Sequence, residues 1–267
     1  MTTATFRIAT WNIGRPGPSG IERNAAIVAK LAEINADIWI LTETNVCIAP
    51  GHAYNSWASP ANAPFRRHGE RATMIWSRLP IRRAIPTFAG IPLRDDAANP
   101  SYPSYGVLGE DASPAVCAEI LTPRGPLLVY GTIITWFGDK GPRETATYEE
   151  EQRRSIPLYS DDWARIATEG PLCVAGDFNA RLRVPTDGLR AETKVARELL
   201  NAALTRSDLV STTVDLDYCI DQICLSRAWA ERAGPPQQFQ ATYGAEQKPV
   251  SDHKGVFIDV PINPPTP

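Results

Sequence analysis

Seven side chains with oxygen or nitrogen ligand atoms stand where apolar, strand-like runs of the sequence begin or end. They are four carboxylates, two carboxamides and one imidazole, spread over most of the chain: Asn12, Glu43, Asp177, Asn179, Asp221, Asp252 and His253. In layered folds of this size, reactive groups gather at the strand ends of a central sheet. The wide separation along the sequence therefore predicts one site assembled by folding, which is typical of an enzyme more than of a binding module.

The chemistry of this set points to a divalent cation and to phosphate. Oxygen-rich ligands without cysteine suit Mg²⁺ or Mn²⁺ better than zinc. A cation beside fixed polar groups serves phosphoryl chemistry, because it neutralises charge on phosphate oxygens while a histidine or aspartate moves protons. We therefore expect a Mg²⁺ (or Mn²⁺) cofactor and a phosphate ester substrate.

Most of these residues, taken alone, also have an ordinary structural interpretation. Asn12 could be a turn residue, and Glu43 could be a solvated carboxylate. Asp177 and Asn179 could stabilise a turn by bonding their own backbone, and Asp252 could cap another turn. Their joint occurrence carries more weight than any one of them.

Asp221 differs from the others because its surroundings are apolar. It lies between Ile220 and Ile223 in a strand-like run, where an unpaired buried carboxylate is costly. A partner is therefore expected, and His253 is the natural one.

Length, composition and charge restrict the class of protein. The chain has 267 residues, 43% hydrophobic content and seven tryptophans, which is ample for a sizeable core and excludes general disorder. A net charge of -3 and a pI near 5.7 argue against a protein that grips nucleic acid by bulk electrostatics. Two basic clusters, 66–68 and 82–83, could be local patches or simply solvated charge.

The sequence shows no secretory signal and no membrane span. The first residues lack a basic segment followed by an apolar one, and no apolar run approaches the roughly 18 residues that a membrane span requires. Five cysteines without zinc spacing predict small buried hydrophobic side chains in a reducing compartment. The expected location is the cytoplasm, and nothing in the sequence indicates an oligomeric state.

Hydrophobic periodicity predicts alternating strands and helices. Residues 6–13 alternate between apolar and polar side chains, which predicts a strand. Ser19 and Glu22 then suggest a capping box at the start of a helix that is expected to end near Asn35. A second strand is predicted over 37–41, and Glu43 stands just past its end. The continuous apolar character of that strand indicates cover on both faces and hence a layered α/β structure.

Further elements follow without a linker or a repeat. A long surface loop is expected over 90–114, a break or kink at Pro157 within a helix, and an irregular tail over 261–267. We predict a single domain over residues 1–267. The other predicted strands are 71–78, 115–121, 127–135, 171–175, 217–226 and 256–260, and the predicted helices are 144–168 and 191–204.

Five short motifs now occur in a familiar order. They are TWNI at 10–13, Glu43 after a buried strand, GDFN at 176–179, IDQI at 220–223 and SDH at 251–253. In this order and spacing, over residues 5 to 260, the chain resembles the endonuclease/exonuclease/phosphatase superfamily, which includes DNase I-like nucleases, abasic-site endonucleases, sphingomyelinases and inositol-polyphosphate phosphatases. The resemblance implies a four-layer α/β sandwich, with two mixed β-sheets packed face to face and helices outside.

The resemblance also implies a metal site. Glu43 would be the main ligand, with Asn12 close by, and Asp252 would complete or extend the site. The number of metal ions stays open.

The catalytic roles implied by the resemblance fall on four residues. His253 would pair with Asp221, which orients the imidazole and stabilises its charged form. Asp177 and Asn179 would lie across the scissile phosphate, with Asn179 donating to a phosphate oxygen. Whether Asp177 or His253 acts as the general base stays open.

One position departs from the family pattern. Near Ile133 the family usually has a histidine or tyrosine that binds phosphate or stabilises the leaving group, and here no titratable side chain stands there. Thr132, Thr135 or Trp136 could take its place, or the site could handle a less demanding leaving group.

The sequence thus predicts a divalent-metal-dependent phosphodiesterase or endonuclease. One alternative is a phosphatase or phosphodiesterase for a small phosphorylated metabolite or a lipid head group. Another is a catalytically inactive binding protein with the same fold, motivated only by Ile133.

Overall fold

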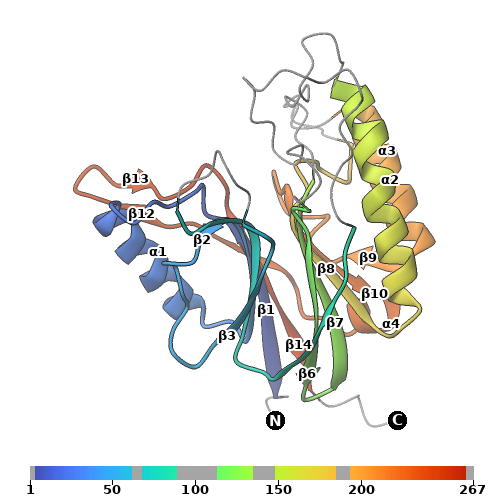
Figure 1. Ribbon diagram of the computed structural model, residues 1–267, viewed down its shortest axis with the longest axis horizontal. Coiled ribbons are helices and arrows are strands. Elements are labelled where there is room, and N and C mark those ends of the chain that lie inside the picture. Colours follow the sequence, from blue (N-terminus) through green and yellow to red (C-terminus); the bar gives the residue numbers. More distant parts are fainter. Residues whose placement is uncertain (1–3, 62–67, 89–112, 135–147, 185–192, 263–267) are drawn as a thin grey trace.

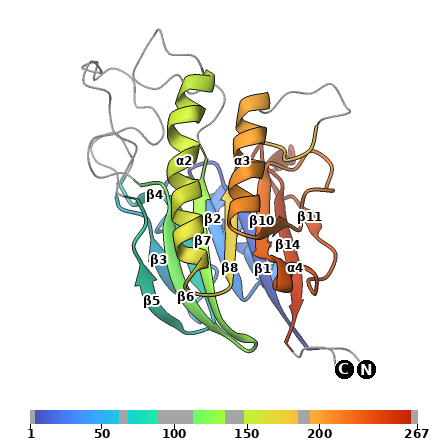
Figure 2. The same ribbon diagram turned by 90° about the vertical axis from the view of Figure 1, so that its right-hand side faces the viewer.

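Two six-stranded mixed sheets pack face to face, with helices on both outer surfaces (Figure 1). The computed structural model describes residues 4–61, 68–88, 113–134, 148–184 and 193–262. Helix α1 (Ile21–Ile34) covers the first sheet, while α2 (Tyr148–Ala167) and α3 (Lys194–Arg206) lie side by side on the second (Figure 2). The predicted four-layer α/β sandwich is confirmed.

The first sheet has the strand order β11-β14-β1-β2-β4-β3. Strands β1 and β2 are parallel, with Asn12 in register with Thr42, and β14 runs antiparallel to β1 on its other side. The bounds are β1 (Thr5–Asn12), β2 (Ile38–Asn45), β3 (Asn55–Ala58), β4 (Glu70–Ser77), β11 (Gln237–Phe239) and β14 (Gly255–Pro261).

The second sheet has the order β5-β6-β7-β8-β10-β9. Strands β7 and β8 are parallel, and β10 runs antiparallel to β8 with Asp221 opposite Asp177. The bounds are β5 (Ile81–Ile85), β6 (Val116–Thr122), β7 (Gly125–Ile133), β8 (Leu172–Asp177), β9 (Leu209–Ser211) and β10 (Asp221–Ser226). A short helix α4 (Arg227–Ala230) and the hairpin β12 (Thr242–Tyr243) and β13 (Lys248–Pro249) complete the structure.

The cap residues of helix α1 form both of its ends without a side-chain cap hydrogen bond. Its C-cap Asn35 has the left-handed φ of 54°, which confirms the predicted end. The predicted capping box is wrong, because the N-cap is Gly20 and makes no side-chain cap bond. Since the helix starts at Ile21, Glu22 occupies the second helical position and not the third that a capping box requires.

Two strand boundaries differ from the sequence-based prediction. Strand β2 continues to Asn45, so Glu43 lies within the strand, where its φ is +44°. Strand β10 begins at Asp221 and not at residue 217, because the preceding segment turns at Tyr218, whose φ is +48°.

Helix α2 passes through Pro157 without ending there. Proline removes a backbone hydrogen bond from a helix interior, yet this helix buries Ile156, Tyr159 and Trp163 completely against the second sheet. The Trp163 ring stacks on Phe178 at 5.8 Å. Burial of this apolar face offsets the loss of one bond, so the predicted break is wrong. The predicted loop 90–114 and the tail beyond residue 262 lie largely outside the described residues.

A glycine of β7 lies in close contact with the opposite sheet. A Cβ atom on Gly131 would lie 2.8 Å from Cγ2 of Thr73 and 3.0 Å from Cγ2 of Ile40, both on the first sheet. The core between the sheets is aliphatic and includes Ile8, Ile40 and Val129. Four cysteines are buried and Cys47 is exposed. In the part of the chain that the structure describes, no helix has the length and apolar character of a membrane span.

Candidate active site

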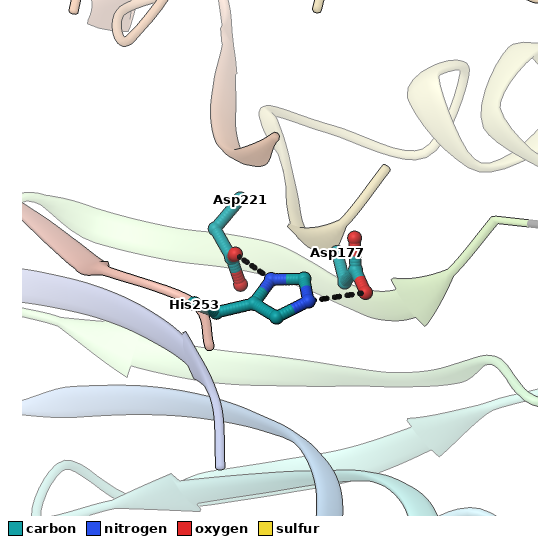
Figure 3. A group of neighbouring side chains, drawn as sticks. All are labelled: Asp177, Asp221 and His253. Atoms are coloured by element: carbon teal, nitrogen blue, oxygen red, sulfur yellow. Dashed lines mark hydrogen bonds and ion pairs between the residues drawn. The ribbon is translucent and has the colours of Figure 1, made fainter. Parts of the chain in front are cut away.

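Five of the seven predicted site residues are joined by hydrogen bonds at one end of the sandwich: Asn12, Asp177, Asn179, Asp221 and His253. Asn12 ends β1, Asp177 ends β8, and Asp221 begins β10, while His253 lies in the turn that precedes β14. Figure 3 shows the side chains of Asp177, Asp221 and His253 pointing toward one another. Segments up to 241 positions apart in sequence therefore form one group.

The buried carboxylate of Asp221 has the partner that the sequence led us to expect. Its Oδ2 lies 2.6 Å from Nδ1 of His253, and its Oδ1 accepts a hydrogen bond of 3.0 Å from the backbone N–H of Asn12. Asp221 is 1% exposed. The contact fixes the imidazole orientation, and its other nitrogen, Nε2, faces Oδ2 of Asp177 at 3.8 Å.

Asp177 is held by hydrogen-bond donors from both sheets. Its Oδ2 accepts from Nδ2 of Asn12 at 2.9 Å and from Nδ2 of Asn179 at 3.2 Å. Its Oδ1 accepts from the backbone N–H of Asn179 at 2.8 Å. Nδ2 of Asn179 also donates to the carbonyl of Ile134 at 3.0 Å, so both of its hydrogens are engaged within the protein. The backbone contact is of the turn type that the sequence allowed, whereas the side-chain contact of Asn179 with Asp177 was not predicted.

Burial and charge shift the pKa values of two of these groups in ways that matter for proton transfer. Burial raises the pKa of Asp177 to about 7; the charge of Asp221 adds to this, while the charge of His253 and the Asn12 hydrogen bond oppose it. Burial alone would lower the pKa of His253, but the charge and hydrogen bond of Asp221, with Asp177 and Asp252, raise it to about 10. At neutral pH the imidazole is therefore protonated, and Asp177 is the group that can exchange a proton.

Glu43 has a different environment from the buried aspartates. Its carboxylate is 23% exposed, and its Oε2 lies 3.0 Å from Nε of Arg15. The same nitrogen lies 3.6 Å from Oε1 of the buried Glu70. Arg15 and Glu70 were not predicted as neighbours of the site, because only the pairing of β2 with β4 brings residue 70 to this end of the sheet.

Asp252 is the most exposed of the predicted residues. Its Oδ1 accepts a hydrogen bond of 3.4 Å from Ser251, and its charge acts on His253. The metal-ligand roles predicted for Asn12, Glu43 and Asp252 stay predictions.

The donor chemistry of this end of the sandwich fits a hard divalent cation. Asp177, Asp221 and His253 offer ligand atoms within 4.8 Å of one another and could hold a metal ion. However, Oδ2 of Asp221 already accepts a hydrogen bond from His253, and Oδ2 of Asp177 already accepts hydrogen bonds from Asn12 and Asn179. The partly exposed carboxylate of Glu43, on the strand that pairs with β1, is the alternative anionic oxygen ligand.

The position that departs from the family pattern lies directly beside the site. Ile133 is in register with Asp177 across β7 and β8 and is 9% exposed. Its carbonyl accepts a hydrogen bond of 2.8 Å from the Tyr159 hydroxyl. An apolar side chain therefore occupies the place next to Asp177, and Thr132 is buried in the same strand. Thr135 and Trp136 lie outside the described residues.

The remaining candidates stand apart from the site. His52 and His68 are exposed. Arg82 pairs with Glu119, and Arg83 pairs with both Glu119 and Glu169. This basic cluster is thus neutralised locally, while residues 66 and 67 lie outside the described part of the chain.

Comparison with known proteins agrees with the predicted resemblance. A profile of the endonuclease/exonuclease/phosphatase family matches residues 9–253. A search of proteins with curated descriptions finds no match.

Several solved structures share the fold. An AP endonuclease from Leishmania major superposes with a TM-score of 0.65 at 15% identity, covering 97% of this chain and 88% of that one. A 3′ phosphatase from Neisseria, bound to a product DNA hairpin, gives 0.64 at 16% identity over 96% and 99% of the two chains. An AP endonuclease from Archaeoglobus fulgidus gives 0.63 at 16% identity over 95% and 98%.

Proposed function

Because the chain belongs to the endonuclease/exonuclease/phosphatase family, whose members are metal-dependent hydrolases of phosphoester bonds, we propose that it is a Mg²⁺- or Mn²⁺-dependent phosphodiesterase, acting as an endonuclease. The observation that carries the proposal is the single hydrogen-bonded group of Asn12, Asp177, Asp221 and His253. The two AP endonucleases named above support the choice of a diester substrate.

Glu43, Asn12 and Asp252 are the residues that would hold the cation. When bound, the cation would neutralise charge on the phosphate oxygens of the substrate. The ion pair with Arg15 orients the carboxylate of Glu43.

The proton chemistry is assigned to Asp177, at the end of β8 in the second sheet, and to His253, which precedes β14 of the first sheet. His253, protonated at neutral pH because Asp221 raises its pKa, would donate a hydrogen bond from Nε2 to a phosphate oxygen. Asp177, whose pKa is raised to about 7, would activate water or protonate the leaving oxygen. Asn179 would hold Asp177 in place, and it can donate to the phosphate only by giving up one of its two present bonds.

A hydrolysis assay on matched substrates tests this function. Supercoiled plasmid, abasic-site duplex, single-stranded DNA, RNA and a chromogenic phosphodiester are each incubated with Mg²⁺ or Mn²⁺ and with EDTA, using wild type, Asp177→Ala and His253→Ala. We expect metal-dependent cleavage that both variants lose. Absence of turnover on every substrate, with the cation still bound, would instead identify a non-catalytic binding protein.

A second candidate is hydrolysis of a small phosphorylated metabolite or a lipid head group. It is favoured by the net charge of -3 and by the local neutralisation of Arg82 and Arg83. The salt dependence of substrate binding separates the two functions, because a polyanion loses affinity steeply as salt rises. A shallow dependence, with cleavage of the chromogenic ester alone, would favour the small substrate.

A further inference from the structure

The relative position of Asn12 and His253 is not set by strand pairing. The ladder between β1 and β14 ends at the pair Thr10–Val256, so both site residues lie beyond it. Backbone hydrogen bonds of the sheet therefore do not fix how the turn carrying His253 sits against the end of β1. Other contacts must do so.

Arg23, in the first turns of α1, joins these two segments directly. Its Nε donates to the carbonyl of Val250 at 2.8 Å. Its Nη2 donates to the carbonyls of Ile13 at 2.7 Å and Gly14 at 3.0 Å. One planar, always-charged guanidinium thus holds the chain just after Asn12 and the chain just before the His253 turn.

The lack of a side chain at Gly14 leaves room for this guanidinium. Gly14 has a φ of +61°, and a Cβ atom there would lie 2.9 Å from Nη2 of Arg23. A side chain at position 14 would both strain the backbone and displace the arginine.

A hydrogen bond from Trp11 also holds the His253 turn against β1. The indole Nε1 of the buried Trp11 donates to the carbonyl of His253 at 3.2 Å. The backbone N–H of His253 in turn donates to Oγ of Ser251 at 3.1 Å. The turn is therefore held at its start by Arg23 and at His253 by Trp11.

We propose that Arg23 is a positioning residue for the Asp221–His253 pair. By holding Val250 against the end of β1, it places the imidazole where Nδ1 meets Asp221 at 2.6 Å while the N–H of Asn12 meets the same carboxylate at 3.0 Å. A role of Arg23 in catalysis rests on the function proposed above, whereas its effect on the geometry of the Asp221–His253 pair does not.

Arg7 provides a matched control at the opposite end of the same strands. Its Nε and Nη2 donate to Asp259 of β14 at 2.8 and 2.9 Å, and its Nη1 donates to the carbonyl of Ile34 at the end of α1 at 2.8 Å. Arg7 therefore joins β1, β14 and α1 far from the site, as Arg23 joins their site-facing ends. Loss of either arginine should lower the melting temperature.

The experiment compares Arg23→Gln, Arg23→Lys and Arg7→Gln with wild type. The structural readout is the downfield proton NMR signal of Nδ1–H of His253 in its short bond to Asp221, assigned by its loss in Asp221→Asn. We expect Arg23→Gln to abolish or broaden this signal and Arg23→Lys to restore part of it. Arg7→Gln should retain the signal, although its melting temperature falls.

Turnover gives the second readout. Because small misplacements of reacting groups are costly, Arg23→Gln should lower kcat roughly 10- to 100-fold with KM within about twofold, while Arg7→Gln stays within about twofold of wild type in both. An unchanged Nδ1–H signal in Arg23→Gln, or an equal loss in Arg7→Gln, would overturn the proposal. If wild type hydrolyses no ester, the proposed function fails while the NMR comparison still decides the role of Arg23.

Discussion

The two sheets present their acidic groups in opposite ways. On the second sheet, Asp177 and Asp221 are each 1% exposed and accept hydrogen bonds from asparagine and histidine donors. On the first sheet, Glu43 is 23% exposed and pairs with Arg15, itself 30% exposed. A buried carboxylate must be satisfied within the protein, whereas a partly exposed ion pair can exchange its partner at little cost. In the proposed function, the buried Asp177 of the second sheet would transfer the proton, and the more exposed Glu43 of the first sheet would hold the cation.

The largest effect is expected from the second sheet. Asp177→Ala removes the group with a pKa near 7 and should lower kcat roughly 10²- to 10⁴-fold. The affinity for Mn²⁺, measured by titration, should stay within about threefold. Asp217→Ala, an exposed carboxylate before β10, is the control. Turnover within threefold of wild type in Asp177→Ala would remove the proton-transfer role from this sheet.

A smaller effect of a different kind is expected from the first sheet. Glu43→Gln should raise the Mn²⁺ concentration needed for half-maximal activity by at least roughly 10-fold, since even outer partners of metal ligands contribute this much. Activity should recover substantially at saturating Mn²⁺. Glu33→Gln, on the exposed side of α1, should change nothing. Unaltered metal dependence in Glu43→Gln would place the cation with Asp177, Asp221 and His253 instead.

The pH dependence of kcat/KM tests the charge states of Asp177 and His253. Activity should rise as Asp177 loses its proton near pH 7 if Asp177 activates water, and should fall there if Asp177 protonates the leaving oxygen. In either case it should fall as His253 loses its proton near pH 10. The folded pKa of His253 lies above its ordinary 6.5, so its stabilising contribution is complete below pH 6.5 and is lost as the pH rises toward 10. The difference in melting temperature between wild type and His253→Ala should therefore shrink over this interval. A profile that is flat between pH 6 and 10 would contradict both assignments.

The smallest effect is expected at Thr42, in register with Asn12. Its buried hydroxyl has no hydrogen-bond partner among the residues that the structure describes. Thr42→Val should therefore change the free energy of unfolding, measured by urea denaturation, by less than about 1 kcal/mol, or stabilise the fold. A 10-fold loss of Mn²⁺ affinity in this variant would instead extend the cation site to this hydroxyl.

Much of the fold could be predicted because hydrophobic patterning is local. Strands β1, β8 and β14 lie close to their predicted ranges, and the end of α1 is correct. Errors arose where tertiary packing outweighed local signals. Pro157 is tolerated because α2 buries an aromatic face, and β2 extends past residue 41 because β4 pairs with it up to Asn45.

The site could be predicted in part for a physical reason. A buried carboxylate requires a partner, so the contact between Asp221 and His253 followed from Asp221 alone. The pairing of Arg15 with Glu43 and Glu70 could not be foreseen, because it depends on the register between strands. The engagement of Asn179 with Ile134 and the bonds of Arg23 depend on loop geometry for which the sequence holds no local signal.

Gly131 affects how the acidic groups of the two sheets are placed relative to each other. The absence of a single methyl group there lets Thr73 and Ile40 of the opposite sheet come within contact distance. The closeness of the sheets at this point limits how far apart their ends can stand beyond it, and those ends carry Glu43 on one side and Asp177 on the other. Gly131 thus helps to set the width of the opening that a phosphate would enter, although this residue would not contact the phosphate.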